Sequence, residues 1–284
     1  MEVTIQTPDD STAPPTKPPV NYWTPAHTVG IFATVIAIPL VCWIWIEVAQ
    51  PVLAWLSTFL LLWIFLLIAG NGVMGVWRGL VIDQRNVMSL SRMQMAMWTV
   101  IVVSGYLTGV LWNIFVGLEN PLAISIPAQV WGLLGIGTAS LVGTPLILST
   151  KKEKTPRKEE MDAFKEADIP KKSRGQMGTL YRNQDIKDAE WADIVTGDEV
   201  GNAAYLDLSK VQMFFFTLII GFAYCAALVH AFGAPNAEGI DAFPYLDESM
   251  VALLGISHAG YLAVKSSPHT ATKLRADDDA AQQP

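Results

Sequence analysis

The best candidates for chemistry in this chain are polar side chains inside an apolar segment near the C-terminus. Ser257, His258 and Tyr261 lie close together there, and a hydroxyl beside an imidazole is a pairing that nucleophilic catalysis uses. Adjacent residues of a helix point about 100° apart, however, and no second histidine lies at a matching depth. We therefore expect His258 to be a hydrogen-bonded imidazole in a packed helix, with a specialised role as the alternative.

Other signatures of catalysis and cofactor binding are missing from the sequence. It lacks the His-Glu-x-x-His motif of zinc proteases, the phosphate-binding Gly-rich loop and the nucleotide-binding Gly-x-Gly-x-x-Gly. Cys42 and Cys225 fall inside apolar segments and lie far apart in sequence, so they offer neither a metal site nor a disulfide framework. The sequence predicts a protein that is not an enzyme and has no catalytic residues, cofactor or metal site.

Long apolar runs set the architecture that positions these residues. Hydrophobic residues make up 51% of the chain and charged residues 16%, and a bilayer-spanning helix needs about 20 apolar residues. The runs lack the alternation of a barrel, and a span must satisfy its backbone hydrogen bonds internally. We predict an all-α integral membrane protein with six transmembrane helices, near residues 28–48, 52–75, 95–117, 127–148, 210–232 and 248–265. The first two form an N-terminal helical hairpin.

The distribution of Lys and Arg predicts the orientation of the chain. Cytoplasmic loops retain basic residues, and with an inside N-terminus every Lys and Arg of this chain falls on one side of the membrane. We expect both termini in the cytoplasm and the protein in a cell (inner) membrane, surrounded by membrane lipids. The formal net charge of −7 sums both sides of the membrane, so no nucleic-acid partner is expected.

Two stretches of the sequence are copies of one another, and each begins an apolar run. The copied pairs are Leu90-Ser-Arg-Met-Gln-Met95 with Leu208-Ser-Lys-Val-Gln-Met213, and Leu133-Leu-Gly-Ile136 with Leu253-Leu-Gly-Ile256. Each copy crosses the membrane twice, so the two copies have the same orientation. The sequence therefore predicts two parallel two-helix repeats in addition to the N-terminal hairpin.

The repeated Ser-(Arg/Lys)-x-Gln motif has a structural interpretation as a helix start. In a capping box the serine hydroxyl accepts from the backbone N–H three residues on, and the glutamine side chain reaches back. We predict two such boxes, Ser91 with Gln94 and Ser209 with Gln212. The alternative is a binding site on the cytoplasmic face that is built twice.

Small residues recur at four-residue spacing on the expected spans. They let helix backbones approach closely, so we predict that they pack helices within or between chains and support a homo-oligomer or membrane complex. The set is Gly105, Gly109, Gly135, Ala139, Gly143, Gly255 and Ala259.

A channel is the alternative to packing, because polar residues on the third and fourth spans could converge at a subunit interface. These residues are Thr99, Ser104, Thr108, Asn113, Thr138, Ser140 and Thr144, and Thr108 and Thr138 join the serine, histidine and tyrosine above as candidate functional polar residues. No ring of charges specifies selectivity. A transporter subunit ranks third, since no intramembrane acid is available for ion coupling.

The loop between the two copies, residues 149–190, is the remaining segment with functional capacity. It opens with basic residues suited to anionic headgroups, and Trp77 and Trp191 ahead of the two copies predict segments at headgroup level. The candidate lipid or partner contacts are Lys151, Lys152, Lys154, Arg157, Lys158, Trp77 and Trp191. Low hydrophobicity predicts a solvated linker without its own core, and the alternative is a docking segment for a cytoplasmic protein.

These features divide the chain into a disordered cytoplasmic tail (1–26), the hairpin (27–76), repeat unit 1 (77–148), the charged loop (149–190), repeat unit 2 (191–265) and a cytoplasmic tail (266–284). The pattern Asp-Leu-Ser-Lys-x-Gln-Met, followed by Leu-Leu-Gly-Ile-Ser-His-Ala-Gly-Tyr-Leu, resembles bacterial polytopic membrane proteins with this duplicated unit. The resemblance covers roughly residues 77–265 and implies a bacterial inner membrane without supplying catalytic residues. We expect a non-enzymatic scaffold or anchor subunit that oligomerises and docks cytoplasmic partners.

Overall fold

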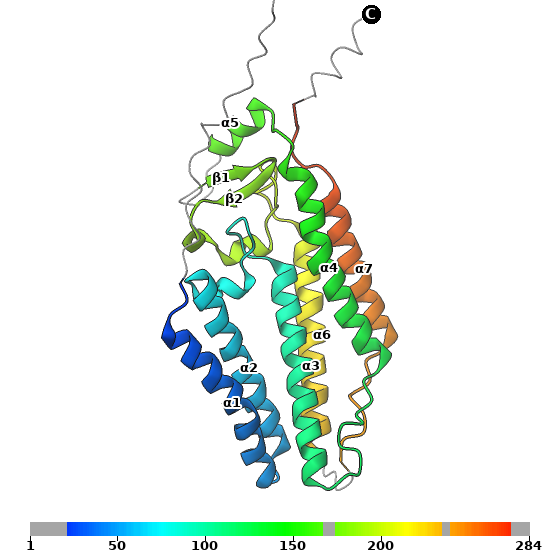
Figure 1. Cartoon of the computed structure of the whole chain (residues 1–284). Coiled ribbons are helices and arrows are strands. Elements are labelled where there is room, and N and C mark those ends of the chain that lie inside the picture. The colour runs from blue at the N-terminus through cyan, green and yellow to red at the C-terminus, as the bar shows by residue number, and fades with distance from the viewer. Residues whose placement is uncertain (1–21, 167–173, 235–238, 274–284) are drawn as a thin grey trace, which may run out of the picture.

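The computed structural model describes residues 22–166, 174–234 and 239–273. Long helices form a bundle with a mixed polar region at one end (Figure 1). The long helices are α1 (Pro25–Glu47), α2 (Pro51–Met74), α3 (Leu90–Phe115), α4 (Ala128–Lys152), α6 (Leu208–Gly233) and α7 (Glu248–Ser266). All but α7 have the length and hydropathy of a membrane span, with mean hydropathy between 1.6 and 2.5. The predicted class, a mainly helical membrane protein, is confirmed.

Four of the long helices, α3, α4, α6 and α7, pack against one another. α3 and α6 run away from the polar region, α4 and α7 run back toward it, and α4 packs along α7 (Figure 1). The hairpin of α1 and α2 packs against α3, and α2 also contacts α6. Trp55 of α2 and Phe232 of α6 stack with ring centroids 6.4 Å apart, which ties the hairpin to α6.

A short 3₁₀ helix, η2 (Trp77–Val81), returns the chain onto the end of α2. The close approach depends on two glycines: a Cβ on Gly79 would lie 2.3 Å from the carbonyl oxygen of Gly70, and a Cβ on Gly70 would lie 2.6 Å from the backbone nitrogen of Leu80. Both contacts are with backbone atoms, so no side chain can move aside to make room. Residues 70 and 79 are therefore restricted to glycine.

We expect Gly79→Ala to lower the free energy of unfolding by about 1–3 kcal/mol, the usual cost of forcing extra atoms into a packed site. The measurement is thermal unfolding in detergent, followed by tryptophan fluorescence. Gly137→Ala is the matched control, because a Cβ there meets no atom within 4 Å. Equal melting temperatures for the two variants would contradict the close approach of η2 to α2.

The polar region is a folded unit, which we call the polar module: residues 75–89, 153–166, 174–207 and 267–273. Its elements are α5 (Lys158–Glu166), the antiparallel strands β1 (Arg174–Met177) and β2 (Leu180–Asn183), and the 3₁₀ helices η3 (Ile186–Asp188) and η4 (Trp191–Ile194). The strands pair in the register Gly175 with Arg182 and Met177 with Leu180. Figure 1 places the module across the ends of α3, α4, α6 and α7.

The polar module has its own hydrophobic core, so the prediction of a coreless linker at 149–190 is wrong for its described part. Phe164 of α5 meets Tyr181 of β2 edge to face at 5.9 Å, and Val87, Val200 and Ala203 pack beside them. These apolar residues are few and come from three separate stretches of chain. Hydropathy averaged over any one stretch therefore does not show the core that they form together.

The predicted capping boxes are also wrong. The N-cap of α3 is Ser89, whose side chain makes no capping hydrogen bond, and Ser91 lies inside the first turn. The N-cap of α6 is Asp207, whose carboxylate accepts from the backbone N–H groups of Ser209 and Lys210 at 3.0 and 3.2 Å. Each helix begins two residues earlier than the motif predicts, so Ser91 and Gln94 are available for tertiary contacts.

The predicted tails are described only in part. Residues 1–21 and 274–284 lie outside the described residues, as do residues 167–173 of the charged loop. The described beginning of the predicted C-terminal tail packs on the polar module. Arg157 donates its backbone N–H to the carbonyl oxygen of Ala271 at 2.8 Å, and Gly201 donates to the Thr270 hydroxyl at 3.0 Å.

Candidate functional site

Asp198 lies at the centre of a group of buried charges where the polar module meets the helices. Its Oδ1 is 2.8 Å from Nη2 of Arg85 and 3.2 Å from Nζ of Lys210, and its Oδ2 is 3.0 Å from Nζ of Lys265. Arg85 also binds Asp83 at 2.9 Å. The side chains of Asp198 and the three cations are at most 10% exposed. We call these five residues the ion cluster.

The ion cluster joins four segments of the chain. Asp83 and Arg85 lie in the loop after η2, Asp198 lies in the loop after η4, Lys210 lies in the first turn of α6 and Lys265 lies in the last turn of α7. Arg85 also donates from Nη1 to the backbone oxygen of Asp198 at 3.2 Å. The loops after η2 and η4 therefore meet at the Arg85 guanidinium, next to the start of α6 and the end of α7.

Burial and charge act in opposite directions on these groups. Burial opposes the charged form of Asp198, but Lys210, Lys265 and Arg85 outweigh it and hold the pKa of the carboxyl well below its usual range. For Arg85, burial alone would lower the pKa, whereas Asp83 and Asp198 together raise it. The surrounding charges therefore keep Asp198 as a carboxylate and Arg85 as a guanidinium in spite of their burial.

Tyr261 extends the ion cluster into the helix interface. Its hydroxyl accepts from Nζ of Lys265 at 2.6 Å and lies 3.3 Å from the Thr144 hydroxyl and 3.4 Å from the Ser91 hydroxyl. Ser91 and Thr144 are 3.2 Å apart. A continuous polar chain therefore links α3, α4 and α7 to the ion cluster, and it uses the repeated serine for tertiary bonding instead of capping.

A second buried ion pair ties α4 to the polar module. Nζ of Lys151 lies 2.6 Å from Oε1 of Glu199, and both side chains are at most 6% exposed. The same ammonium donates to the carbonyl oxygens of Lys265 at 2.5 Å and Ser267 at 2.7 Å. Lys151 is therefore not available to lipid or a partner, which overturns its predicted docking role.

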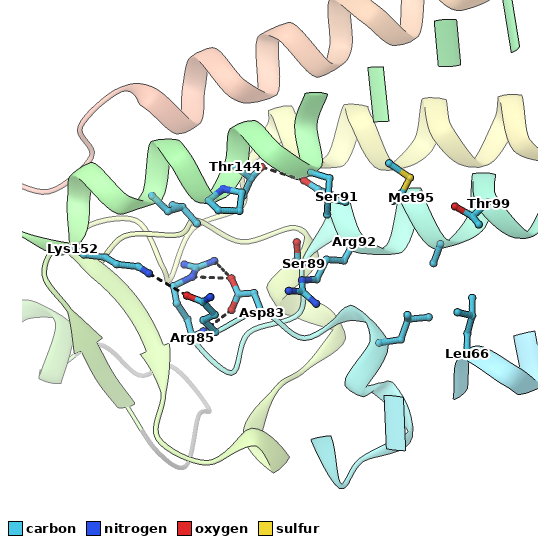
Figure 2. Close-up of a pocket in the computed structure, with 16 residues that line it drawn as sticks. Leu66, Asp83, Arg85, Ser89, Ser91, Arg92, Met95, Thr99, Thr144 and Lys152 are labelled. Atoms are coloured by element: carbon cyan, nitrogen blue, oxygen red, sulfur yellow. Dashed lines mark hydrogen bonds and ion pairs between the residues drawn. The ribbon is translucent and has the colours of Figure 1, made fainter. Parts of the chain in front are cut away.

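A cleft of about 460 Å³ opens beside the ion cluster, between α2, α3, α4 and the loop after η2. Figure 2 shows Leu66 of α2 facing Met95 and Thr99 of α3 on one side, with Arg92, Asp83, Arg85 and Lys152 on the other. Leu141, Pro145 and Leu148 of α4 complete the apolar part of the lining. The cleft thus has a hydrocarbon wall within the helices and a charged rim next to the polar module.

Two of the cations in this rim have no acidic partner among the described residues. Arg92 is exposed and makes no ion pair there, and Nζ of Lys152 donates only to Oε1 of Gln84, at 3.3 Å. Arg85, by contrast, is paired with Asp83 and Asp198. The unpaired positive charge of the cleft therefore resides on Arg92 and Lys152.

The two copies of the repeated motif differ in environment at this point. Gln94 of the first copy is buried and donates from Nε2 to Thr217 of the second copy at 2.5 Å. Their counterparts, Gln212 and Thr99, are both exposed. Likewise Lys210 is buried in the ion cluster, while Arg92 at the matching position faces the cleft. The cleft therefore lies beside Arg92 and Thr99, whose counterparts in the other copy of the motif are buried.

The candidate polar residues of the spans are used in packing contacts. Nδ1 of His258 lies 2.6 Å from the Ser140 hydroxyl, not from Ser257, so the adjacent serine and histidine do not form a nucleophile and base pair. The Thr108 hydroxyl lies 3.7 Å from the sulfur of Cys42, and the Thr138 hydroxyl donates to the carbonyl oxygen of Leu134. Tyr261 alone of this set takes part in the candidate site.

The other residues of the predicted polar path are also mostly internal. Ser104 donates to the carbonyl oxygen of Ile101, and Asn113 donates to that of Ile240 at 2.7 Å. Thr99 is exposed in the cleft. Ser104 and Asn113 are therefore buried within the chain, whereas Thr99 and Thr138 are exposed.

The small residues divide into inward-facing and outward-facing groups. A Cβ on Gly109 would lie 2.9 Å from Ile124, and one on Gly105 would lie 3.2 Å from Phe243, so both glycines permit contacts within the chain. Gly143 and Gly255 have side-chain neighbours at 3.6 Å. Gly135 has no atom near its would-be Cβ, and Gly135, Ala139 and Ala259 are exposed.

The remaining predicted contact residues lie on the surface. Lys154, Arg157 and Lys158 are exposed, and Nε of Arg157 donates to the carbonyl oxygen of Thr272 at 3.1 Å. Trp77 and Trp191 begin η2 and η4 and are both 63% exposed, so the matched tryptophans do occupy matching surface segments.

Sequence reasoning missed the ion cluster. By sequence, Lys210 and Arg85 count only among the basic residues that indicate the cytoplasmic side. One signal was present: Asp83 and Asp198 each follow a segment that begins with a tryptophan, Trp77 or Trp191, and each precedes one copy of the repeated motif.

A scan against protein-family models and searches of curated proteins and solved structures found no match for this chain. The fold itself defines the class. The chain is a multi-pass helical membrane protein with a folded polar module held at one end of its bundle.

Proposed function

We propose that this protein is a non-enzymatic anchor or scaffold subunit of a bacterial inner membrane, which holds the polar module at the cytoplasmic surface for soluble partners. In this proposal α7 crosses the bilayer together with the other five long helices, giving six spans. The clustering of Lys and Arg at the module end supports a cytoplasmic orientation, because cytoplasmic segments retain basic residues.

The observation that carries this proposal is the ion cluster. A flexible linker would not need four chain segments to meet at buried charges, whereas a rigid platform does. Removing one member of a buried, hydrogen-bonded charge pair is strongly destabilising, so the pairs resist separation of the module from the helices. The polar module is thereby fixed in orientation relative to the membrane.

The duplicated unit belongs to the same proposal. α3 with α4 and α6 with α7 run in matching directions, and each pair follows a 3₁₀ helix that begins with an exposed tryptophan. This supports an internal duplication, in which the second copy supplies Asp198 and Lys210 to the junction. It also supports placing both tryptophans at headgroup level.

Oligomerisation is part of the proposal and has its own test. Gly135 and Ala139 are exposed on α4, and a Cβ on Gly135 would meet no atom of the described residues within 4 Å, which suits close contact with a second copy. Gly135→Leu should convert an oligomer to monomers in native mass spectrometry, while Gly260→Leu, at a second glycine with open space, should not. Retention of the oligomer in both variants would count against this interface.

The proposed function is tested by purification from the native host in mild detergent, followed by native mass spectrometry of the intact complex. We expect a complex that contains a soluble subunit, lost when the exposed Lys154 and Lys158 are both replaced by Glu, with an unchanged melting temperature. A homo-oligomer without soluble subunits that conducts ions in liposomes would overturn the scaffold and support a channel.

A further inference from the structure

The cleft beside the ion cluster lies at the level where the apolar spans end. α3 begins at Leu90 and α4 ends at Lys152, and residues from both helix ends line the cleft. Leu66 of α2 and Leu141 of α4 extend its lining toward the middle of the helices. A molecule bound here would have one end beside the polar module and the other among membrane-facing helices.

The lining is suited to a molecule with an anionic end and an apolar end. Its wall is made of Leu66, Met95, Leu141, Pro145 and Leu148, whereas its rim presents Arg92 and Lys152. A planar guanidinium binds phosphate oxygens through two parallel hydrogen bonds, and an ammonium adds a compact point charge. The hydroxyl of Ser89 and the amide of Gln84 add neutral hydrogen-bonding groups to the same rim.

The charges behind the rim increase its preference for an anion. The ion cluster contains two carboxylates and three cations, so it has one net positive charge. Asp83 reaches the cleft, but it is paired with Arg85 at 2.9 Å and does not neutralise Arg92 or Lys152. An occupant with a phosphate group would compensate positive charge that the described part of the chain leaves unpaired.

The size and position of the cleft select among anions. About 460 Å³ lies within the range of about 300–1,000 Å³ usual for small-molecule sites, which is far more than a free phosphate needs. Most of its wall is hydrocarbon, and a soluble anion would gain nothing from that surface. α2 and α4 both pack on α3, and the cleft lies between these three helices. It can therefore receive the part of an acyl chain that is nearest the headgroup.

We propose that this cleft binds one anionic phospholipid, with its headgroup phosphate on Arg92 and Lys152 and its upper acyl chain against Leu66, Leu141 and Pro145. The site does not depend on the scaffold function, because it rests on the cleft and not on any partner. It also accounts for the difference between the two copies: Lys210 has Asp198 as its counter-ion, whereas Arg92 obtains one from the lipid.

The test uses the full-length protein, delipidated in a non-ionic detergent and then mixed with phosphatidylglycerol, phosphatidylcholine or inorganic phosphate. Native mass spectrometry counts the lipids retained per chain. We expect one retained phosphatidylglycerol and at least tenfold less phosphatidylcholine. Arg92→Ala combined with Lys152→Ala should reduce the retained phosphatidylglycerol at least tenfold. Lys154→Ala combined with Lys158→Ala should retain it, since these exposed lysines lie outside the lining and match the change in charge.

A second variant separates the headgroup from the chain. Leu141→Trp narrows the apolar wall and keeps both cations, so it should abolish retention of the lipid without changing the charge of the rim. Equal retention of the two lipids, or equal loss in the matched lysine control, would overturn the proposal. Thermal stabilisation by inorganic phosphate that matches the effect of phosphatidylglycerol would identify a free anion as the occupant and overturn it as well. A wild-type melting temperature in the Arg92→Ala and Lys152→Ala double variant shows that its loss of lipid is not loss of fold.

Discussion

The Asp198→Asn variant should lose about 3–5 kcal/mol of unfolding free energy, the usual cost of removing one partner of a buried ion pair. Asparagine keeps the shape of the side chain but leaves Lys210 and Lys265 without a carboxylate and Arg85 with Asp83 alone. The three cations would then be buried in excess of their counter-ions. The measurement is unfolding by titration with a denaturing detergent, followed by tryptophan fluorescence.

Asp162→Asn is the matched control for this variant. Asp162 lies on the exposed face of α5 in the same polar module, and the identical chemical change there should alter the unfolding free energy by less than about 0.5 kcal/mol. Limited proteolysis adds a local readout, because release of the module from the helix ends should expose its chain to cleavage in Asp198→Asn first. If the two variants unfold alike, Asp198 does not hold the junction together.

The Lys151 and Glu199 pair should show the second largest effect. Lys151→Met leaves the Glu199 carboxylate buried without its ammonium, so we expect a loss of about 3–5 kcal/mol of unfolding free energy. Adding Glu199→Gln to this variant should recover part of that loss, because the double variant contains no unpaired buried charge. The two substitutions should therefore be non-additive by more than about 1 kcal/mol, as is usual for directly contacting residues.

The control cycle for this pair uses exposed neighbours of the same types. Lys154→Met and Glu153→Gln repeat the two chemical changes at exposed positions three and two residues after Lys151. The effects of these two substitutions should add. The same unfolding titration serves both cycles. Additive effects in the buried pair would mean that Glu199 and Lys151 do not interact in the folded protein, despite a separation of 2.6 Å between their charged atoms.

The ion cluster and the Lys151 pair both attach the polar module to the helices. The ion cluster connects the module to α6 and α7, and the Lys151 pair connects it to α4. Backbone oxygens of Lys265 and Ser267 accept from Lys151, so the two sets of contacts meet at the end of α7. Loss of either set should loosen the module, and loss of both should loosen it further.

Local sequence patterns predicted the helices well and the site poorly. The hydropathy of a span is a sum over about 20 consecutive residues, so the apolar runs alone indicated where α1, α2, α3, α4 and α6 would form. The capping boxes failed although they are local, because Asp207 caps α6 more directly than Ser209 can. At α3 the buried interface recruits Ser91 and Gln94 into contacts with other helices.

The polar module shows why composition alone does not predict a folded unit here. Its mixed charges resemble those of a solvated linker, yet Asp198 and Glu199 are buried in it, paired with Lys210 of α6 and Lys151 of α4. A charged residue can be buried only with its counter-ion, and nothing in a single segment reveals whether that counter-ion will arrive from elsewhere. Phe164 and Tyr181 similarly form a core only after β2 and α5 are brought together.

By itself, the sequence determined that this is a multi-pass helical membrane protein, because burial in lipid is decided by the hydropathy of each run independently of the others. Only the tertiary structure decided which charges meet. Arg85 and Asp198 are 113 positions apart, and Lys151 and Glu199 are 48 apart. Their pairing depends on how the helix ends and loops pack, and the cleft beside them exists because Arg92 and Lys210, alike in sequence, are placed in different surroundings by that packing.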